Sequence, residues 1–261
     1  MSRNTIRSLL CLSLAASLVG CSGSNSSDEP EADNSGNSIA TPSEAETMST
    51  STETGTMSTA TVFDPIDEGL IGPLGGSGIN NEYAQFDDSP FANISFGQGY
   101  FYLEDFEDKV LEHPGASAST GNFVSLEFGE GFHDSVDADD GLIDGNSLSG
   151  ESWFHAVSTT GVVWSFDAQQ LNGQLPTHVG IVWTDGRIQT TFEAFDAGGQ
   201  SLGTIVAEHH DGSFNGETGD DRFYGVVNYA GVSAIKVSND YRLTGIELDH
   251  LQWGYLPAEL R

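Results

Sequence analysis

From residue 100 to the C-terminus, the chain is a succession of short segments rich in β-branched and aromatic residues, separated by Gly, Asn and Asp. Such segments favour strands, the residues between them favour turns, and no long amphipathic helical pattern interrupts them. The expected strands lie within 100–108, 122–130, 152–158, 161–168, 178–185, 188–196, 201–209, 222–229, 232–238 and 244–253. This pattern predicts an all-β fold, an antiparallel β-sandwich or jelly roll.

Alternation of apolar and polar residues assigns faces within these segments, because alternate side chains of a strand point the same way. The residues expected to share apolar faces are Val162, Trp164 and Phe166 in one strand and Val179, Ile181 and Trp183 in another. Residues 184–186 and 197–200 are rich in turn-forming types and are expected to be hairpin turns.

The first 20 residues have the pattern of a secretory signal peptide. Arg3 and Arg7 precede an apolar run that is too short to span a membrane. The run ends in "LVGC", which resembles the lipobox of bacterial lipoproteins, in which Cys21 would become the first mature residue and carry acyl chains. The alternative is an ordinary cleaved signal with a chance Cys. Ser22 follows Cys21, and by analogy with Gram-negative lipoproteins this favours the outer membrane or cell surface.

Residues 21–61 are dominated by Ser, Thr, Asn and acids and contain few large apolar residues. Such a segment cannot bury enough surface to fold, so it is expected to be a flexible tether. Residues 62–261 are then a single β-sandwich domain. Because Cys11 lies in the signal and Cys21 is the lipidation site, the mature domain is expected to have no disulfide.

The chain has 39 Asp and Glu against 8 Lys and Arg, a formal net charge of −31. This charge excludes nucleic acid as a partner and argues against electrostatic binding to anionic lipid, since both need Lys and Arg. Two interpretations remain, and they are compatible: an acidic surface suited to salty water, or carboxylates that bind divalent cations.

One acidic cluster lies in the stretch "DSVDADDGLIDG", residues 134–145. Ca²⁺ takes carboxylate and carbonyl oxygens, often from one acidic loop kinked by glycine. The candidate ligands are Asp137, Asp139, Asp140 and Asp144. Their spacing is not that of an EF-hand. The alternative is a solvated acidic loop.

A second cluster joins the two ends of the domain. Glu104 and Asp105 lie near the first expected strand, and Glu247 and Asp249 lie on the last. In jelly-roll carbohydrate-binding modules a structural Ca²⁺ commonly bridges acids on the first and last strands, and this analogy of fold class predicts a Ca²⁺ clip here. The alternative is that these are exposed carboxylates.

Two further residues are candidates for ligand binding. Arg222 lies beside several acids; it is expected to pin its own turn by pairing with a carboxylate, and a ligand-binding role is the alternative. Aromatic side chains could stack on sugar rings. For Trp164 and Trp183 the alternation favours the core, whereas Trp253 at the end of the last strand is the candidate for stacking.

Catalytic patterns are weak. The seven histidines are dispersed without zinc-hydrolase spacing, and no nucleophile elbow is present. Asp and Glu pairs are so abundant that chance pairs are expected. The sequence therefore leaves catalysis open and favours a role that is not enzymatic.

The motifs that follow one another from about residue 121 to residue 255 are "HDSVDADDGLIDG", "LPTHVGIVWTDG", "FEAFDAGGQSLG", "GETGDDRFYGV", "GVSAIKVSN" and "GIELDHLQWG". They resemble a family of exported bacterial β-sandwich domains of uncertain function that is common in PEP-CTERM-sorted proteins. The sequence differs from sorted members in having a lipobox and no sorting helix after "GYLPAELR", and in "GDDRF", where an acid, often Glu, is expected before "DRF". The resemblance implies a surface location and a β-sandwich, but no defined activity.

Together these features predict a cell-surface lipoprotein with a Ca²⁺-stabilised β-sandwich of the galactose-binding-like or carbohydrate-binding-module type. It is expected to bind a glycan or an extracellular matrix polymer. A structural or adhesive surface protein without a small ligand is the first alternative. A polysaccharide-degrading enzyme on a jelly-roll fold is the second.

Overall fold

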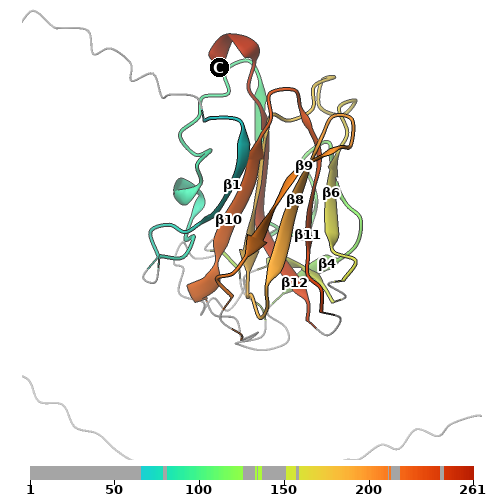
Figure 1. Cartoon of the computed structure of the whole chain (residues 1–261). Coiled ribbons are helices and arrows are strands. Elements are labelled where there is room, and N and C mark those ends of the chain that lie inside the picture. The colour runs from blue at the N-terminus through green and yellow to red at the C-terminus, as the bar shows by residue number, and fades with distance from the viewer. Residues whose placement is uncertain are drawn as a thin grey trace, which may run out of the picture. The chain divides into compact units, whose positions relative to one another are not determined.

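The computed structural model describes residues 66–78, 81–125, 133, 135–136, 151–156, 159–210, 212, 218–241 and 244–261. These residues form two antiparallel β-sheets packed face to face, as Figure 1 shows. The strands are β1 (Gly69–Leu74), β2 (Tyr100–Glu104), β3 (Ala116–Ala118), β4 (Asn122–Ser125), β5 (Glu151–His155), β6 (Val162–Phe166), β7 (His178–Thr184), β8 (Thr190–Asp196), β9 (Ser201–Ala207), β10 (Arg222–Val227), β11 (Val232–Ser238) and β12 (Ile246–Tyr255). The all-β antiparallel sandwich predicted from the sequence is confirmed.

The two sheets differ in size. The larger has the order β1-β10-β7-β12-β5-β4, with β2 also paired to β12, and the smaller has the order β3-β6-β11-β8-β9. In the described part of the chain, single turns of 3₁₀-helix accompany them at Phe86–Asp88, Thr218–Asp220 and Ala258–Leu260. No helix among the described residues has the length and apolar character needed to cross a bilayer.

The last strand, β12, organises the larger sheet. Along one side it pairs with β7, and along the other it pairs first with β5 and then with β2. The register shifts between Asp249 and Gln252, and His250 in this gap has a φ of 44°. The extra residue is a β-bulge, which re-aims the side chains that follow. Leu248 and Leu251 consequently both face the interior.

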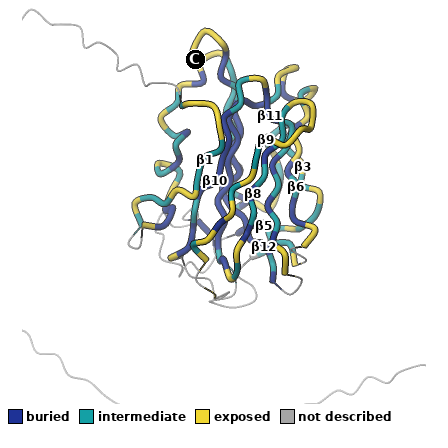
Figure 2. Tube along the Cα trace, in the orientation of Figure 1, coloured by how far each residue is buried: buried dark blue, intermediate teal, exposed yellow. Residues whose placement is uncertain are grey.

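The main core lies between the sheets. Val162, Trp164 and Phe166 are buried there, while Val163 and Ser165 alternate with them and are less buried. Val179, Ile181 and Trp183 are buried from the opposite sheet. The faces that alternation assigned to these residues are therefore confirmed, and Figure 2 shows the buried interior between the layers.

The outer face of the larger sheet is also covered. The segment 81–99 lies across it, and Tyr83 and Phe91 pack there against Val182, Phe223 and Val227. Both faces of β7 are therefore in contact with apolar groups, and every residue of the strand is buried.

All ten expected strands are present, but β1 and β3 were missed. β1 contains Gly69, Gly72 and Pro73, residue types that are depleted in strands, and β3 has only three residues. The hairpin at 197–200 is confirmed: it joins β8 to its partner β9, and the backbone N–H of Asp196 donates to the carbonyl of Gln200. The hairpin at 184–186 is wrong, because β7 and β8 belong to different sheets and the segment carries the chain between them.

Several sequence-based predictions fall outside the described residues. They concern the signal peptide (1–20), Cys21, the tether (21–61), and the loop residues Asp137, Asp139, Asp140 and Asp144.

Candidate functional site

A row of aromatic rings follows the pairing of β2 with β12. Tyr100 lies opposite Tyr255, and Tyr102 lies opposite Trp253. The ring centroids of Tyr100 and Tyr102 are 5.5 Å apart, and those of Tyr100 and Tyr255 are 6.1 Å apart, with interplanar angles of 29° and 28°. His113 continues the row at 5.3 Å from Tyr102. Directly opposed residues share one face of a sheet, so the register of these two strands produces the row.

The side chains of this row are partly exposed, and in the described part of the chain three of them have polar atoms without a hydrogen-bond partner. Tyr100, Tyr102, His113 and Tyr255 all have intermediate exposure. Among the described residues, no hydrogen bond satisfies the hydroxyls of Tyr102 and Tyr255 or the ring nitrogens of His113. Aromatic faces with polar tips can contact the C–H faces and hydroxyls of a sugar at the same time. We call these four residues the aromatic row.

Tyr100 is held in place more firmly than its neighbours. Its hydroxyl donates to the carbonyl of Gln174 at 2.8 Å. Burial raises the pKa of Tyr100, and the neighbouring phenols of Tyr102 and Tyr255 raise it further. The hydroxyl therefore stays protonated and keeps its role as a donor, which fixes the middle of the row.

Trp253, the predicted stacking residue, lies beside Tyr102 on the same face of the sheet. Its side chain is fully buried in the main core, where it packs against Tyr102 at 5.5 Å and Phe166 at 6.0 Å. A ring in this position packs the core and has no surface left for a ligand. The sequence carried a signal for the row in "YFY" at 100–102, because tyrosines two residues apart in a strand share a face.

A second cluster of polar groups lies around Ser135, where the chain enters the predicted acidic loop. The Ser135 hydroxyl lies 3.0 Å from Glu107 Oε1, 3.2 Å from Asp249 Oδ2 and 3.3 Å from the carbonyl of Glu151. Asp249 Oδ2 also accepts a hydrogen bond from the backbone N–H of Val136 at 2.7 Å. These contacts hold Ser135 and Val136 against β12, and Asp137 follows them directly in the sequence.

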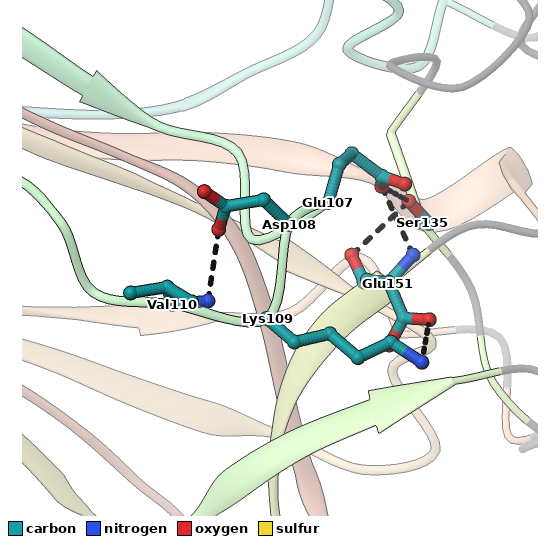
Figure 3. A network of polar contacts seen from close by, with 6 residues as sticks. All are labelled: Glu107, Asp108, Lys109, Val110, Ser135 and Glu151. Atoms are coloured by element: carbon teal, nitrogen blue, oxygen red, sulfur yellow. Dashed lines mark hydrogen bonds and ion pairs between the residues drawn. The ribbon is translucent and has the colours of Figure 1, made fainter.

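Figure 3 shows the part of this cluster that surrounds Glu151. Glu107 Oε1 accepts a hydrogen bond from the backbone N–H of Glu151 at 2.9 Å, and Lys109 Nζ lies 2.6 Å from Glu151 Oε1. Glu151 is buried, and none of the described residues gives its Oε2 a hydrogen-bond partner. The Lys109 ammonium therefore neutralises Glu151, while Glu107 and Asp249 both contact the Ser135 hydroxyl.

Asp249 is an anchor for the loop. It is fully buried, and burial raises its pKa well above the usual range, while the N–H groups of Val136 and His250 oppose this shift. The Glu107 carboxylate raises the pKa further. The oxygens of Asp249 accept three hydrogen bonds, two of them from Ser135 and Val136, and so hold the 135–136 segment against β12.

The acids of the predicted clip between the first and last strands lie on two different faces of the larger sheet. Glu104 lies opposite Leu251, which faces the core, so its side chain lies on the inner face of the sheet. Asp249 points to the outer face, toward Ser135 and Val136. Glu247 shares that outer face and binds the hydroxyl of Ser152 and, at 3.0 Å, Nδ1 of His133.

Glu104 therefore lies on the opposite face of the larger sheet from Glu247 and Asp249. Asp105 accepts a hydrogen bond from the backbone N–H of Glu107 in the turn that follows β2. Among the residues that the structure describes, no group of three or more His, Cys, Asp or Glu is arranged to hold a metal ion.

Arg222 binds its own turn, as predicted, but through carbonyls. Its Nη1 donates to the carbonyls of Asp221 at 2.6 Å and Gly219 at 3.4 Å. These contacts give the guanidinium a structural role at the start of β10.

No protein-family model matches the sequence, and the comparison with curated proteins gives no match. Solved structures give distant matches. The C-terminal family 22 carbohydrate-binding module of a Clostridium thermocellum protein is 9% identical, with a TM-score of 0.34, over 61% of this chain and 95% of that one. The K3 cleaved adhesin domain of Lys-gingipain from Porphyromonas gingivalis is 12% identical, with a TM-score of 0.32, over 60% of this chain and 99% of that one.

A xylan-binding domain of the same family 22 is 10% identical, with a TM-score of 0.31, over 61% of this chain and 96% of that one. With TM-scores this low, these likenesses carry no argument about a ligand, and the site is defined by its own geometry.

Proposed function

We propose that this chain is a cell-surface lipoprotein whose β-sandwich binds a glycan or another extracellular polymer through the aromatic row. The observation that carries the proposal is the row itself. Its rings follow one another in space in the order Tyr255, Tyr100, Tyr102 and His113, and the centroids of successive rings are 6.1, 5.5 and 5.3 Å apart. Apolar C–H faces and hydroxyls recur along a polysaccharide, so a row of rings with polar tips contacts several units at once.

The electrostatics favour a neutral polymer. The chain has a formal net charge of −31, and the turn after β2, which leads to His113, carries Asp105, Asp108 and Glu112. These carboxylates repel a polyanion that approaches the row, and the repulsion is strongest at low salt.

We further propose that the loop with Asp137, Asp139, Asp140 and Asp144 binds Ca²⁺. Its support is the density of carboxylates in the sequence, together with the buried contacts of Ser135 and Val136 that fix the chain just before Asp137. Bound Ca²⁺ offsets part of the repulsion among these acids.

Polymer binding is tested with the mature chain carrying Cys21→Ser, so that the protein stays in solution. Retention is measured by electrophoresis through gels containing neutral or anionic polysaccharides, followed by calorimetry with the best ligand. Tyr102→Ala and Tyr255→Ala should each raise the dissociation constant roughly threefold to tenfold. This corresponds to the loss of one aromatic contact, which contributes about 0.5–1.5 kcal/mol. Tyr241→Ala is the control, since this tyrosine is exposed and lies outside the row.

If the parent protein and Tyr102→Ala are both folded and are retained equally by the gel, the aromatic row does not bind the polymer. Binding to none of the polymers would favour the structural or adhesive role. Release of reducing sugar ends during incubation would instead favour the enzyme.

A further inference from the structure

The outer face of the five-stranded sheet has a composition unlike the rest of the protein. Its outward-pointing residues alternate with the buried core residues of β6, β8, β9 and β11, and they are mainly Ser, Thr, Ala and Val. Only two of them are charged, Glu193 and Lys236, which lie opposite each other on β8 and β11. In a chain with a net charge of −31, this face is electrically neutral.

This face also exposes apolar side chains. Val206 and Leu202 on β9 are 46% and 38% exposed, and Phe195 on the neighbouring β8 and Val163 on β6 are partly exposed. Figure 2 shows how exposed and partly exposed positions alternate with buried ones along these strands. The outer face of the other sheet, by contrast, is covered by the segment 81–99. We call the outer face of the five-stranded sheet the open face.

The two charges on the open face are arranged so that the face can match a copy of itself. Glu193 Oε1 accepts a hydrogen bond from Ser201 at 2.7 Å, and in the described part of the chain Lys236 has no ion pair. An interface around a two-fold axis uses the same patch on both subunits, so each group must meet its complement in the other copy. A neighbouring Lys and Glu meet this condition: Lys236 of each copy can face Glu193 of the other.

We propose that the open face is the interface of a two-fold homodimer. Two copies with this net charge repel each other over most of their surfaces. The open face carries no net charge, so two copies can approach through it without electrostatic repulsion between the facing surfaces. Burial of Phe195, Leu202 and Val206 supplies the driving force, and the pairing of Lys236 with Glu193 sets the register.

This interface has a characteristic response to salt. Salt screens the repulsion between the acidic bodies and leaves the burial of apolar surface intact. Dimerisation should therefore strengthen as sodium chloride rises from about 0.1 M to about 1 M, whereas an association held mainly by ion pairs would weaken.

The test is sedimentation equilibrium of the full mature chain with Cys21→Ser, at both salt concentrations. The parent should be a dimer with the stated salt response. Val206→Glu should raise the dissociation constant about tenfold or more. Val110→Glu is its matched control, because Val110 is a similarly exposed valine (53%) outside the open face, and it should leave the constant near the parent value.

Charge reversal gives a second, independent measurement. Lys236→Glu places four acids at the centre of the interface and should dissociate the dimer, and the double variant Glu193→Lys/Lys236→Glu should restore it. Thermal unfolding of each variant checks that it is folded. A monomer at every concentration and salt level, or a dimer that Val206→Glu and Lys236→Glu leave unchanged, would overturn the proposal. A monomer that loses polymer binding with Val206→Glu would overturn it in favour of a ligand-binding face.

Discussion

At the scale of single residues, Glu104 shows how burial changes the chemistry of a carboxyl group. It is buried at the end of β2, its Oε1 accepts a hydrogen bond from the backbone N–H of Phe106 at 3.3 Å, and its Oε2 has no hydrogen-bond partner among the described residues. Burial raises its pKa to about 7, and the nearby carboxylates of Asp105, Asp108 and Glu112 act in the same direction. The contact with Phe106 opposes the shift but does not cancel it.

The raised pKa of Glu104 means that the stability of the protein should fall as the pH rises. An acid whose pKa is higher in the folded state favours folding while it is protonated, so its contribution is lost as pH rises from about 4.5 to about 7. Glu104→Gln keeps the acceptor for Phe106 and cannot ionise. We expect it to be more stable than the parent by about 1–2 kcal/mol at pH 8, with the difference narrowing at pH 5.

Urea unfolding of both proteins at the two pH values measures this difference. Glu112→Gln is the control, because it removes an exposed acid from the same connection and should change the free energy of unfolding little. Parallel pH profiles for the parent and Glu104→Gln would show that Glu104 ionises normally.

At the scale of an element, β7 depends on a glycine to accept contacts on both faces. Gly180 lies beneath the rings of Phe223 and Phe91, which cover the outer face of the larger sheet. A Cβ at this position would lie 2.3 Å from ring atoms of Phe223 and 3.2 Å from the ring of Phe91. Neither ring can keep its place with alanine there, since both are packed in the second core.

Gly180→Ala should therefore loosen the cover without breaking the sheet. We expect a loss of about 1–3 kcal/mol in the free energy of unfolding and a weaker near-ultraviolet circular dichroism signal. Gly198→Ala is the matched control, because a Cβ there meets only one oxygen of Asp196, at 3.3 Å, in an exposed turn. Identical unfolding midpoints for the two variants would mean that the segment 81–99 is not firmly packed.

At the scale of the whole molecule, the excess of acids requires that something offset it. Carboxylates are buried as well as exposed: Glu104, Glu151, Glu247 and Asp249 are all nearly inaccessible. Most of these contact donors from the protein itself, such as Lys109, Ser152 and Val136. For the acids of the 137–144 loop, the proposed source of positive charge is a bound cation.

If the loop binds Ca²⁺, thermal unfolding of the chelated protein should occur at a lower temperature than unfolding with Ca²⁺, because a ligand of the folded state stabilises it by mass action. At a Ca²⁺ concentration 100 times the dissociation constant, the gain is about 2.7 kcal/mol. Asp139→Ala and Asp140→Ala should each abolish most of it. An equal response to Mg²⁺ and Ca²⁺ would indicate general charge screening instead.

Much of the secondary structure could be predicted because its cause is local. Alternation in β6 places Trp164 in the core whatever its partners are, and the turn at 197–200 closes a hairpin through its own backbone contacts. The segment 184–186 has similar turn-forming residues, yet it connects two sheets. The residue types of a segment indicate that the chain turns there, but which strand the next one pairs with depends on packing across the molecule.

The candidate site could be predicted only in part, for the same reason. The sequence identified the aromatic character of the last strand and selected Trp253, and the acids at both ends of the domain suggested a shared cation. The register between β2 and β12 places Trp253 and the tyrosines on the same face of the larger sheet, and packing against the main core buries Trp253 completely and leaves Tyr100, Tyr102 and Tyr255 partly exposed. The same register separates Glu104 from Asp249 across the sheet.

The sequence by itself determined the strand-rich composition, the faces of the regular strands and the acidic character of the chain, because each follows from neighbouring residues and their side-chain chemistry. Only the tertiary structure decided which strands pair, which sheet face is covered and which aromatic rings remain partly exposed. Those outcomes depend on contacts between residues far apart in the chain, such as Tyr100 with Tyr255 and Ser135 with Asp249. Pairing and packing bring such residues together, and a one-residue bulge is enough to change which of them meet.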